Sequence, residues 1–140
     1  MYLCDVNIFV YAHREDAPNH TIYLEWLENL LNSDEIFAVS ELVLSGFLRI
    51  VTHPKIFNPP SSLVDALEFI TEIRQHPKCL VVAPQGRHWS IFQDLCEISK
   101  AKGNLIPDAY HAALAIEVGC EWVTSDRGFS RYQGLKWKVL

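Results

Sequence analysis

The stretch "NLIPDAYHAALAIEVGCEWVTSDRGF", residues 104 to 129, decides the fold of this chain. It is mostly small and apolar, yet it opens with one acid, Asp108, and closes with another, Asp126. The pattern predicts a helix over about 107–118 and a strand at 121–125. A helix of a dozen residues descends about 18 Å, and the strand climbs back over a similar distance. The two acids are therefore expected to be neighbours in space.

The rest of the chain alternates the same two patterns. The helical spacing of apolar residues predicts helices at 20–32, 40–52, 62–75 and 87–102, and a further helix can follow Asp5. Continuous apolar runs predict strands at 2–4, 35–39, 79–84 and 136–140. Strands without polar alternation that take turns with helices are typical of a parallel sheet covered on both faces. We therefore expect an α/β fold, a three-layer α/β/α sandwich with a parallel central sheet, in a single domain spanning residues 1–140.

Composition narrows the function classes. The net charge of −5 at pH 7 disfavours tight, sequence-blind binding to a polyanion, because such binding neutralises phosphates with Lys and Arg. An RNA substrate stays compatible with this charge if metal ions meet its phosphates. No apolar run approaches the roughly 20 residues of a membrane span. The N-terminus lacks a basic region before its apolar residues, so we expect a cytoplasmic protein without a membrane partner.

The cysteines, histidines and tryptophans form no recognisable catalytic or zinc motif. The chain has no CxxC pair, so we expect reduced thiols in the core at Cys4, Cys79, Cys96 and Cys120. It also has no H-x-x-x-H pair, and His111 is expected to pack rather than to bind a metal. The four tryptophans lie in helix or strand patterns and are expected in the core. Neither a G-x-S-x-G elbow nor a phosphate-binding P-loop is present.

Four acids are placed to meet at one edge of the predicted sheet. Asp5 follows the first strand, and Glu41 follows the second strand at the start of a helix. Asp108 lies in the first turn of its helix, and Asp126 follows the strand at 121–125. In this fold the carboxyl ends of strands and the amino ends of helices share one edge, so all four acids are expected there.

Each acid taken alone has a simpler explanation. Asp5, Glu41 and Asp108 suit the amino ends of helices, and Asp126 suits a turn. Three or four carboxylates gathered within several Å repel one another, and some stay protonated unless a cation holds them. The hard divalent cations Mg²⁺ and Mn²⁺ take such oxygen ligands. The sequence therefore predicts a magnesium site in which Mn²⁺ can substitute.

Four motifs in this order carry a resemblance to a known family. They are "DVN" at 5–7, "GFLRIVTHPKIF" at 46–57, "NLIPDAYHAALA" at 104–115 and "VTSDRGF" at 123–129. Together they resemble the PIN domain, and more narrowly the VapC ribonuclease toxins of bacterial toxin–antitoxin pairs. The likeness runs from about residue 2 to residue 138.

The resemblance implies an Mg²⁺-dependent endoribonuclease that cuts RNA with a metal-activated water and no protein nucleophile. It also implies a homodimer and a small antitoxin partner of the VapB kind. By position, Asp5 and Asp108 match the family's principal metal ligands, and Asp126 matches its last acid. Asn7 and Ser125 match polar positions that orient those ligands. Among the basic residues, those expected to guide RNA are Arg14, Arg49, Lys55 and Arg127.

One position departs from the family pattern. The family usually has a glutamate where this chain has Gly46, and Glu41 is the expected substitute from the start of the same helix. If Glu41 does not reach the other acids, the site has three acids and a second metal ion is no longer expected. Because Gly46 stands where an acid is expected, a catalytically impaired module that binds RNA or protein is the alternative function. An aspartyl phosphatase is disfavoured, because its general acid would stand where Asn7 is.

Overall fold

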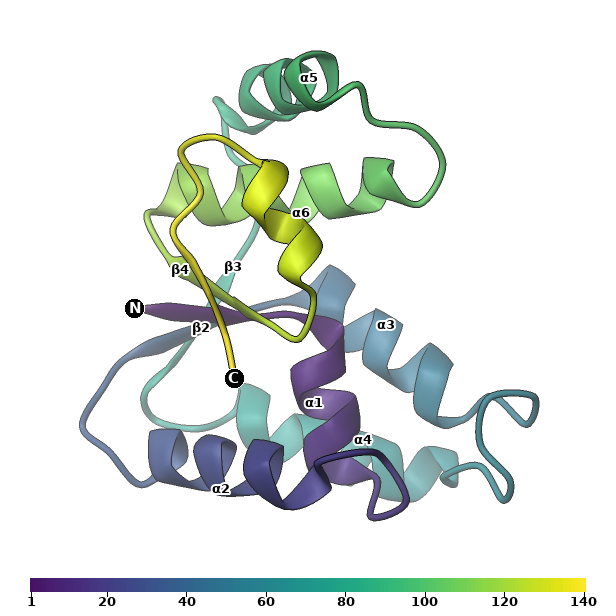
Figure 1. The fold of residues 1–140 in the computed structure, drawn as a ribbon. Helices are drawn as coiled ribbons and strands as arrows, with labels where there is room; N and C mark the ends of the chain where they lie inside the picture. The colour runs from purple at the N-terminus through teal and green to yellow at the C-terminus, as the bar shows by residue number, and fades with distance from the viewer.

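A parallel sheet of five strands forms the middle of the molecule (Figure 1). We analysed a computed structural model that describes all 140 residues. The strand order is β3-β2-β1-β4-β5, and every neighbouring pair is parallel. The strands are β1 (Tyr2–Cys4), β2 (Phe37–Ser40), β3 (Cys79–Val82), β4 (Glu121–Thr124) and β5 (Trp137–Val139).

Helices cover both faces of this sheet. Those on one side are α1 (Val6–His13), α2 (His20–Leu31), α3 (Glu41–Val51) and α4 (Leu63–Arg74). Those on the other side are α5 (His88–Ser99), α6 (Leu105–Val118) and the short 3-10 helix η1 (Arg127–Arg131). The three-layer α/β/α arrangement with a parallel sheet is thus confirmed. No helix is both long enough and apolar enough to span a bilayer.

The core lies between the sheet and its helices. One cluster of 31 buried residues fills it, and its largest fully buried side chains include Phe9, Phe37, Phe47, Trp122 and Phe129. All four residues of β2 are buried, as expected for a strand covered on both faces. The four cysteines are free thiols, and two of them are buried in the core.

Two sequence expectations are corrected at the margin of this core. Trp89 is 66% exposed, because its helix α5 packs mainly on α6 and lies outside the layer that touches the sheet. The edge strand β3 is only partly covered, and its Leu80 and Val81 side chains are 49% and 42% exposed. The remaining predicted elements are present, with ends that move by one to three residues.

Candidate functional site

Asp5 is locked in place where β1 ends and α1 begins. Its backbone N–H donates to the Val123 carbonyl of β4 at 2.8 Å, which extends the pairing of β1 with β4 by one residue. One carboxylate oxygen, Oδ1, accepts from the Val6 N–H at 2.7 Å and so caps α1. The other, Oδ2, accepts from the Thr124 hydroxyl at 2.7 Å. Both oxygens of Asp5 therefore have fixed directions before any ligand arrives.

The carboxylates of Asp5, Asp108 and Asp126 lie close enough to repel one another. Burial is the main cause that raises the pKa of Asp5 to about 6, the charges of Asp108 and Asp126 act in the same direction, and its two hydrogen bonds oppose the shift. Burial also raises the pKa of Asp108, as does the charge of Asp126. The three acids come from the ends of β1 and β4 and from the first turn of α6, so the fold gathers them at one sheet edge.

Thr124 is a site residue that sequence reasoning missed. Its side chain is completely buried at the end of β4, between two of the acids. Its hydroxyl donates to Asp5 and accepts from the backbone N–H of Asp126 at 3.0 Å. The available signal was a hydroxyl residue at the end of an apolar strand, directly before Ser125 and Asp126. The polar pair that the sequence did indicate, Asn7 and Ser125, is joined by a longer bond of 3.4 Å.

Asp126 also has a structural role. Its Oδ1 accepts from the Gly128 N–H at 2.7 Å and caps η1, while the residue remains exposed. The position of Asp126 is therefore compatible both with an ordinary turn residue and with an acid of the metal site. The single hydrogen bond to Oδ1 leaves Oδ2 without a protein partner.

Glu41 does not lie among the other acids. It begins α3, is exposed, and pairs with Arg74 of α4 at 3.1 Å. Gly46, five residues further along α3, packs against α1. A Cβ at Gly46 would stand 3.2 Å from Val6 Cγ2, beside the residue that follows Asp5. The structure thus brings three of the four predicted acids together, whereas the fourth, Glu41, pairs with Arg74.

The donor set at this edge suits a hard cation. No three Asp, Glu, His or Cys side chains converge tightly enough to enclose an ion by themselves. Mg²⁺ nevertheless binds through one or two carboxylates and fills its other positions with waters and phosphate oxygens. Asp5 and Asp108 supply only oxygens, and both are held with raised pKa values by burial and by neighbouring negative charge, which a cation would neutralise. The residues present therefore fit a magnesium ion.

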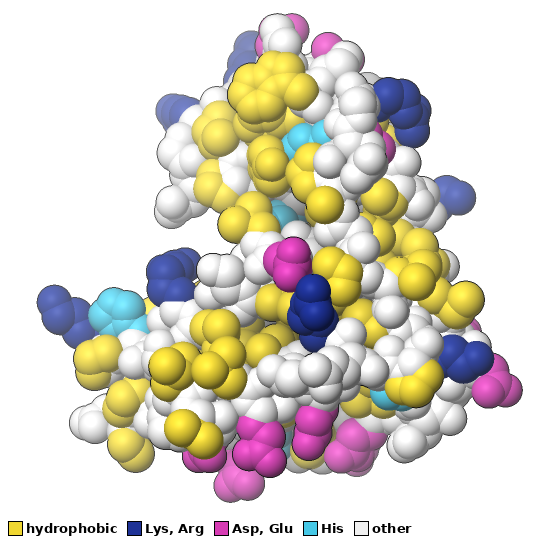
Figure 2. Space-filling view, turned by 180° about the vertical axis from the view of Figure 1, so that it is seen from behind, with side chains coloured by type: hydrophobic (Ala, Val, Ile, Leu, Met, Phe, Trp, Pro, Cys, Tyr) yellow, Lys and Arg dark blue, Asp and Glu magenta, His cyan; other side chains and the backbone are white.

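The predicted RNA-guiding residues divide into two groups. Arg14 is engaged: it pairs with Asp16 at 2.8 Å, donates to the Pro59 carbonyl and the Ser61 hydroxyl, and lies over the Phe57 ring. Arg49, Lys55 and Arg127 are exposed and form no ion pair. Basic side chains gather on the projecting end of α3 and its following loop, at the lower left of Figure 2.

Arg14 is therefore expected to hold the 53–62 loop onto α1. Its side chain is only 13% exposed, so Arg14→Ala removes packing and the hydrogen bonds to Pro59 and Ser61 as well as the ion pair. The free energy of unfolding should fall by about 2 kcal/mol. Urea denaturation measures this, with Arg49→Ala as the exposed control that should stay within about 0.5 kcal/mol of wild type. Equal stability of the two variants would contradict the assigned role.

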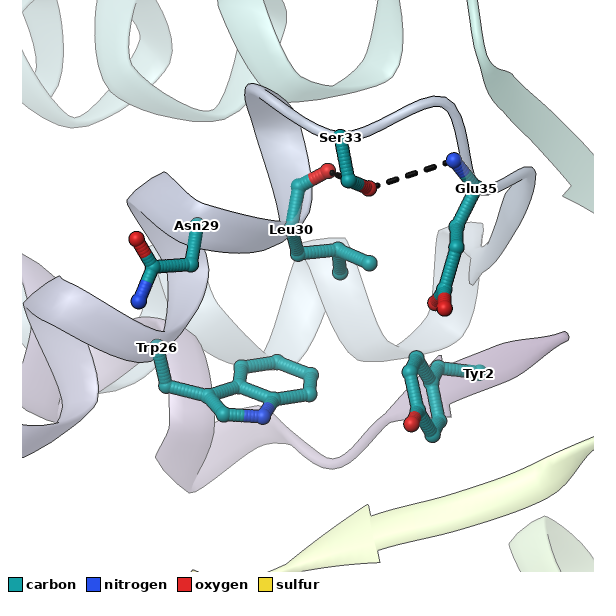
Figure 3. A pocket seen from close by; sticks show the side chains of 6 residues that line it. All are labelled: Tyr2, Trp26, Asn29, Leu30, Ser33 and Glu35. Atoms are coloured by element: carbon teal, nitrogen blue, oxygen red, sulfur yellow. Dashed lines mark hydrogen bonds between the residues drawn. The ribbon is translucent and has the colours of Figure 1, made fainter.

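A separate hollow lies at the opposite end of the strands. It has a volume of about 180 Å³ and lies between α2 and β1 (Figure 3). Tyr2 and Trp26 pack edge to face along it, and Ser33 closes it by bonding to the Leu30 carbonyl and the Glu35 N–H. None of the predicted site residues lines this hollow.

Comparison with known proteins agrees with the motifs and the fold. The PIN domain family model matches residues 2–135. VapC ribonuclease Mb2897 of Mycobacterium bovis is 40% identical over 138 residues, covering 99% of this chain and 94% of the relative. Ribonuclease VapC25 of Mycobacterium tuberculosis is 40% identical over 136 residues, covering 97% and 96%.

Solved structures share the same fold. VapBC2 from Rickettsia felis, bound to a DNA fragment from its promoter, matches with a TM-score of 0.72 at 20% identity, over 99% of this chain and 97% of that one. FitAcB from Neisseria gonorrhoeae matches with a TM-score of 0.68 at 21% identity, over 98% and 96%. The chain belongs to the PIN-domain family, and within it to the VapC ribonucleases.

Proposed function

We propose that this protein is an Mg²⁺-dependent endoribonuclease toxin that cleaves RNA phosphodiester bonds and is neutralised by a small cognate antitoxin. The observation that carries the proposal is the gathering of Asp5, Asp108 and Asp126 at the carboxyl edge of the sheet. The names of the ribonuclease relatives support RNA as the substrate class.

Asp5 and Asp108 would hold the magnesium ion, with Asp126 accepting hydrogen bonds from its waters. When bound, Mg²⁺ lowers the pKa of water and offsets the negative charge that develops on the phosphate oxygens. The protein's own contribution is orientation. Thr124 and the Val6 N–H fix the two oxygens of Asp5, so ligand binding requires no rearrangement of that carboxylate.

The protein needs no nucleophile of its own for this chemistry. Ser125 is the hydroxyl residue nearest the acids in sequence, and its bond is to the amide of Asn7 and not to a base. Asn7 and Ser125 are better suited to positioning the acids. Arg49, Lys55 and Arg127 would guide the RNA backbone toward the edge, since their cationic side chains are exposed and unpaired.

Two kinds of protein partner belong to the proposal. The antitoxin is supported by solved neighbours whose titles name VapBC or FitAB complexes, some of them with DNA. Figure 2 shows apolar side chains, in yellow, on one face of the molecule. A homodimer is supported by the large apolar side chains that stay exposed on helices of both layers and on the edge strand. These include Leu42 on α3, Leu67 on α4, Leu80 and Val81 on β3, and Trp89 on α5.

Cleavage of total cellular RNA by the purified protein tests the nuclease. Discrete fragments are expected with Mg²⁺, none with EDTA, and fragments again when Mn²⁺ is added back. Intact RNA in every lane, from folded protein shown by mass to be free of antitoxin, would reject the proposal.

The impaired binding module is the second candidate, because Gly46 provides no carboxylate and Glu41 is held by Arg74. Titration with Mn²⁺ followed by calorimetry separates the two functions. A protein that binds RNA but no Mn²⁺ is the binding module.

Glu41→Gln tests whether the fourth acid takes part in cleavage. Its pair with Arg74 is exposed on both sides, so the variant should lose no more than about 1 kcal/mol of stability and cleave RNA within about twofold of wild type. Arg74→Gln breaks the same pair from the other side and serves as its control. A large loss of cleavage in Glu41→Gln alone would return Glu41 to the site.

A further inference from the structure

We propose that Arg131 contacts the scissile phosphate of the RNA and acts as a catalytic residue beside the three acids. This inference rests on the proposed function and adds to it a cationic group of the protein itself. No sequence motif indicated this residue, which lies at the last position of η1.

The guanidinium of Arg131 is anchored at one end and open at the other. Its Nε donates to the Gly128 carbonyl at 2.8 Å. Its Nη2 lies 2.9 Å from the point that a Cβ of Gly128 would occupy, and Asp126 Oδ1 lies 2.9 Å from the same point. Arg131 and Asp126 therefore border the same small space, which exists because residue 128 has no side chain.

The segment that carries Arg131 is pinned to the helix that carries Asp108. Phe129 and Tyr132, on either side of it, are almost completely buried and pack against each other. The Tyr132 hydroxyl donates to the Leu105 carbonyl at 3.1 Å, in the same first turn of α6 as Asp108. Figure 1 shows η1 on the same side of the sheet as α6. Arg131 is thus a positioned side chain, although its tip is exposed.

Arg131 lies near the acids but forms no ion pair with them. Neither of the two ion pairs in the chain includes Arg131, and its Nη groups make no hydrogen bond. Arg131 is nevertheless close to Asp108, because its positive charge lowers the pKa of Asp108 and so opposes the effect of burial. A fixed guanidinium with free Nη donors is the group best shaped to hold two phosphate oxygens.

A phosphate that enters this edge needs such a group. Three carboxylates line the edge, so an incoming phosphodiester meets repulsion that one divalent ion offsets only in part. Arg131 approaches from the α6 side with its Nη donors and stabilises the charge that grows on the non-bridging oxygens during cleavage.

The first experiment measures Mg²⁺-dependent cleavage of a fluorogenic single-stranded RNA. Arg131→Ala should lower kcat at least about tenfold, since loss of one transition-state donor typically has this effect or a greater one. Arg131→Lys should retain only part of the wild-type kcat, because an ammonium group lacks the two parallel N–H donors of a guanidinium. Added guanidinium at millimolar concentration should partly restore Arg131→Ala, which a structural defect would not allow.

Lys136→Ala is the matched control. Lys136 is exposed, carries the same charge, and lies at the opposite edge of the sheet, just before β5. It should leave kcat within twofold of wild type. A kcat for Arg131→Ala equal to that of Lys136→Ala overturns the proposal.

The second experiment does not depend on cleavage. Nuclear magnetic resonance follows the Arg131 Nε–H signal, identified by its loss in Arg131→Ala, while inorganic phosphate is added with Mg²⁺ present. A saturating shift supports the contact, and a signal that never moves overturns it. If the wild type cuts no RNA, the nuclease proposal fails by itself and this signal still decides the role of Arg131.

Discussion

Asp5→Asn is expected to abolish RNA cleavage and to stabilise the fold at neutral pH. The variant loses a principal magnesium ligand, so cleavage should fall at least about a thousandfold. The same change removes a charge that the folded state disfavours, because burial raises the pKa of Asp5 from 3.8 to about 6. At about 1.4 kcal/mol for each pKa unit, ionised Asp5 costs about 3 kcal/mol at pH 7. A neutral amide of the same shape avoids this cost, but its NH2 group cannot accept the bond that Thr124 donates, so the net gain is smaller than about 3 kcal/mol.

Urea denaturation at pH 7 without metal measures the stability gain. Asp94→Asn, on the exposed face of α5, is the matched control and should change stability by less than about 0.5 kcal/mol. Addition of Mg²⁺ should raise the Tm of wild type and leave the Tm of Asp5→Asn unchanged. A variant less stable than wild type would show that Asp5 serves chiefly as the cap of α1.

His111→Phe is expected to protect the protein against acid. The His111 ring stacks on Trp122 at 5.4 Å and 17°, and its Nδ1 is buried without a hydrogen-bond partner. Burial lowers the pKa of His111 from 6.5 to about 4. Between pH 6.5 and about 4, His111 is therefore protonated in the unfolded chain but neutral in the folded chain. The free energy of unfolding falls as the pH drops through this range. The loss from this group approaches about 3 kcal/mol, and phenylalanine removes it while keeping the stack.

Asp5 works in the opposite direction over nearly the same window. Its cost is present above pH 6 and disappears as the pH falls toward 3.8, so protonation of Asp5 offsets protonation of His111. The wild type should therefore show a nearly flat contribution from the two groups between pH 6.5 and 4. Asp5→Asn should become acid-sensitive in that window, whereas His111→Phe should gain stability as the pH falls. Parallel pH profiles for the two variants would contradict the assignment.

The sequence predicted the placement of those acids whose positions follow from chain topology. Asp5, Asp108 and Asp126 stand at the ends of a strand, a helix and another strand, so a parallel fold alone brings them to one edge. Glu41 obeys the same rule but is exposed, and a flexible side chain there is directed by the nearest cation, which is Arg74 of α4. Pairing between helices that are distant in sequence cannot be deduced from periodicity.

Thr124 and Arg131 were missed for different physical reasons. Thr124 belongs to a strand, and strand residues are interpreted by their apolar neighbours, so a buried hydroxyl that joins two acids gives no periodic signal. Arg131 depends on a short 3-10 helix and on the empty space at Gly128, and neither follows from composition. Trp89 was placed in the core because helical spacing does not distinguish an inner helix from one stacked outside it.

The pairing of β1 with β4 has a consequence for synthesis on the ribosome. The backbone N–H of Asp5 bonds to residue 123 and its carboxylate bonds to residue 124, so this acid gains its partners only after more than a hundred further residues have been synthesised. Nascent chains lengthen at about 5–20 residues per second, and contacts this remote in sequence form only after both partners have left the exit tunnel. A product that ends before β4 lacks Asp126 itself and the Val123 and Thr124 groups that hold Asp5. The three acids are thus brought together only after β4 has been synthesised.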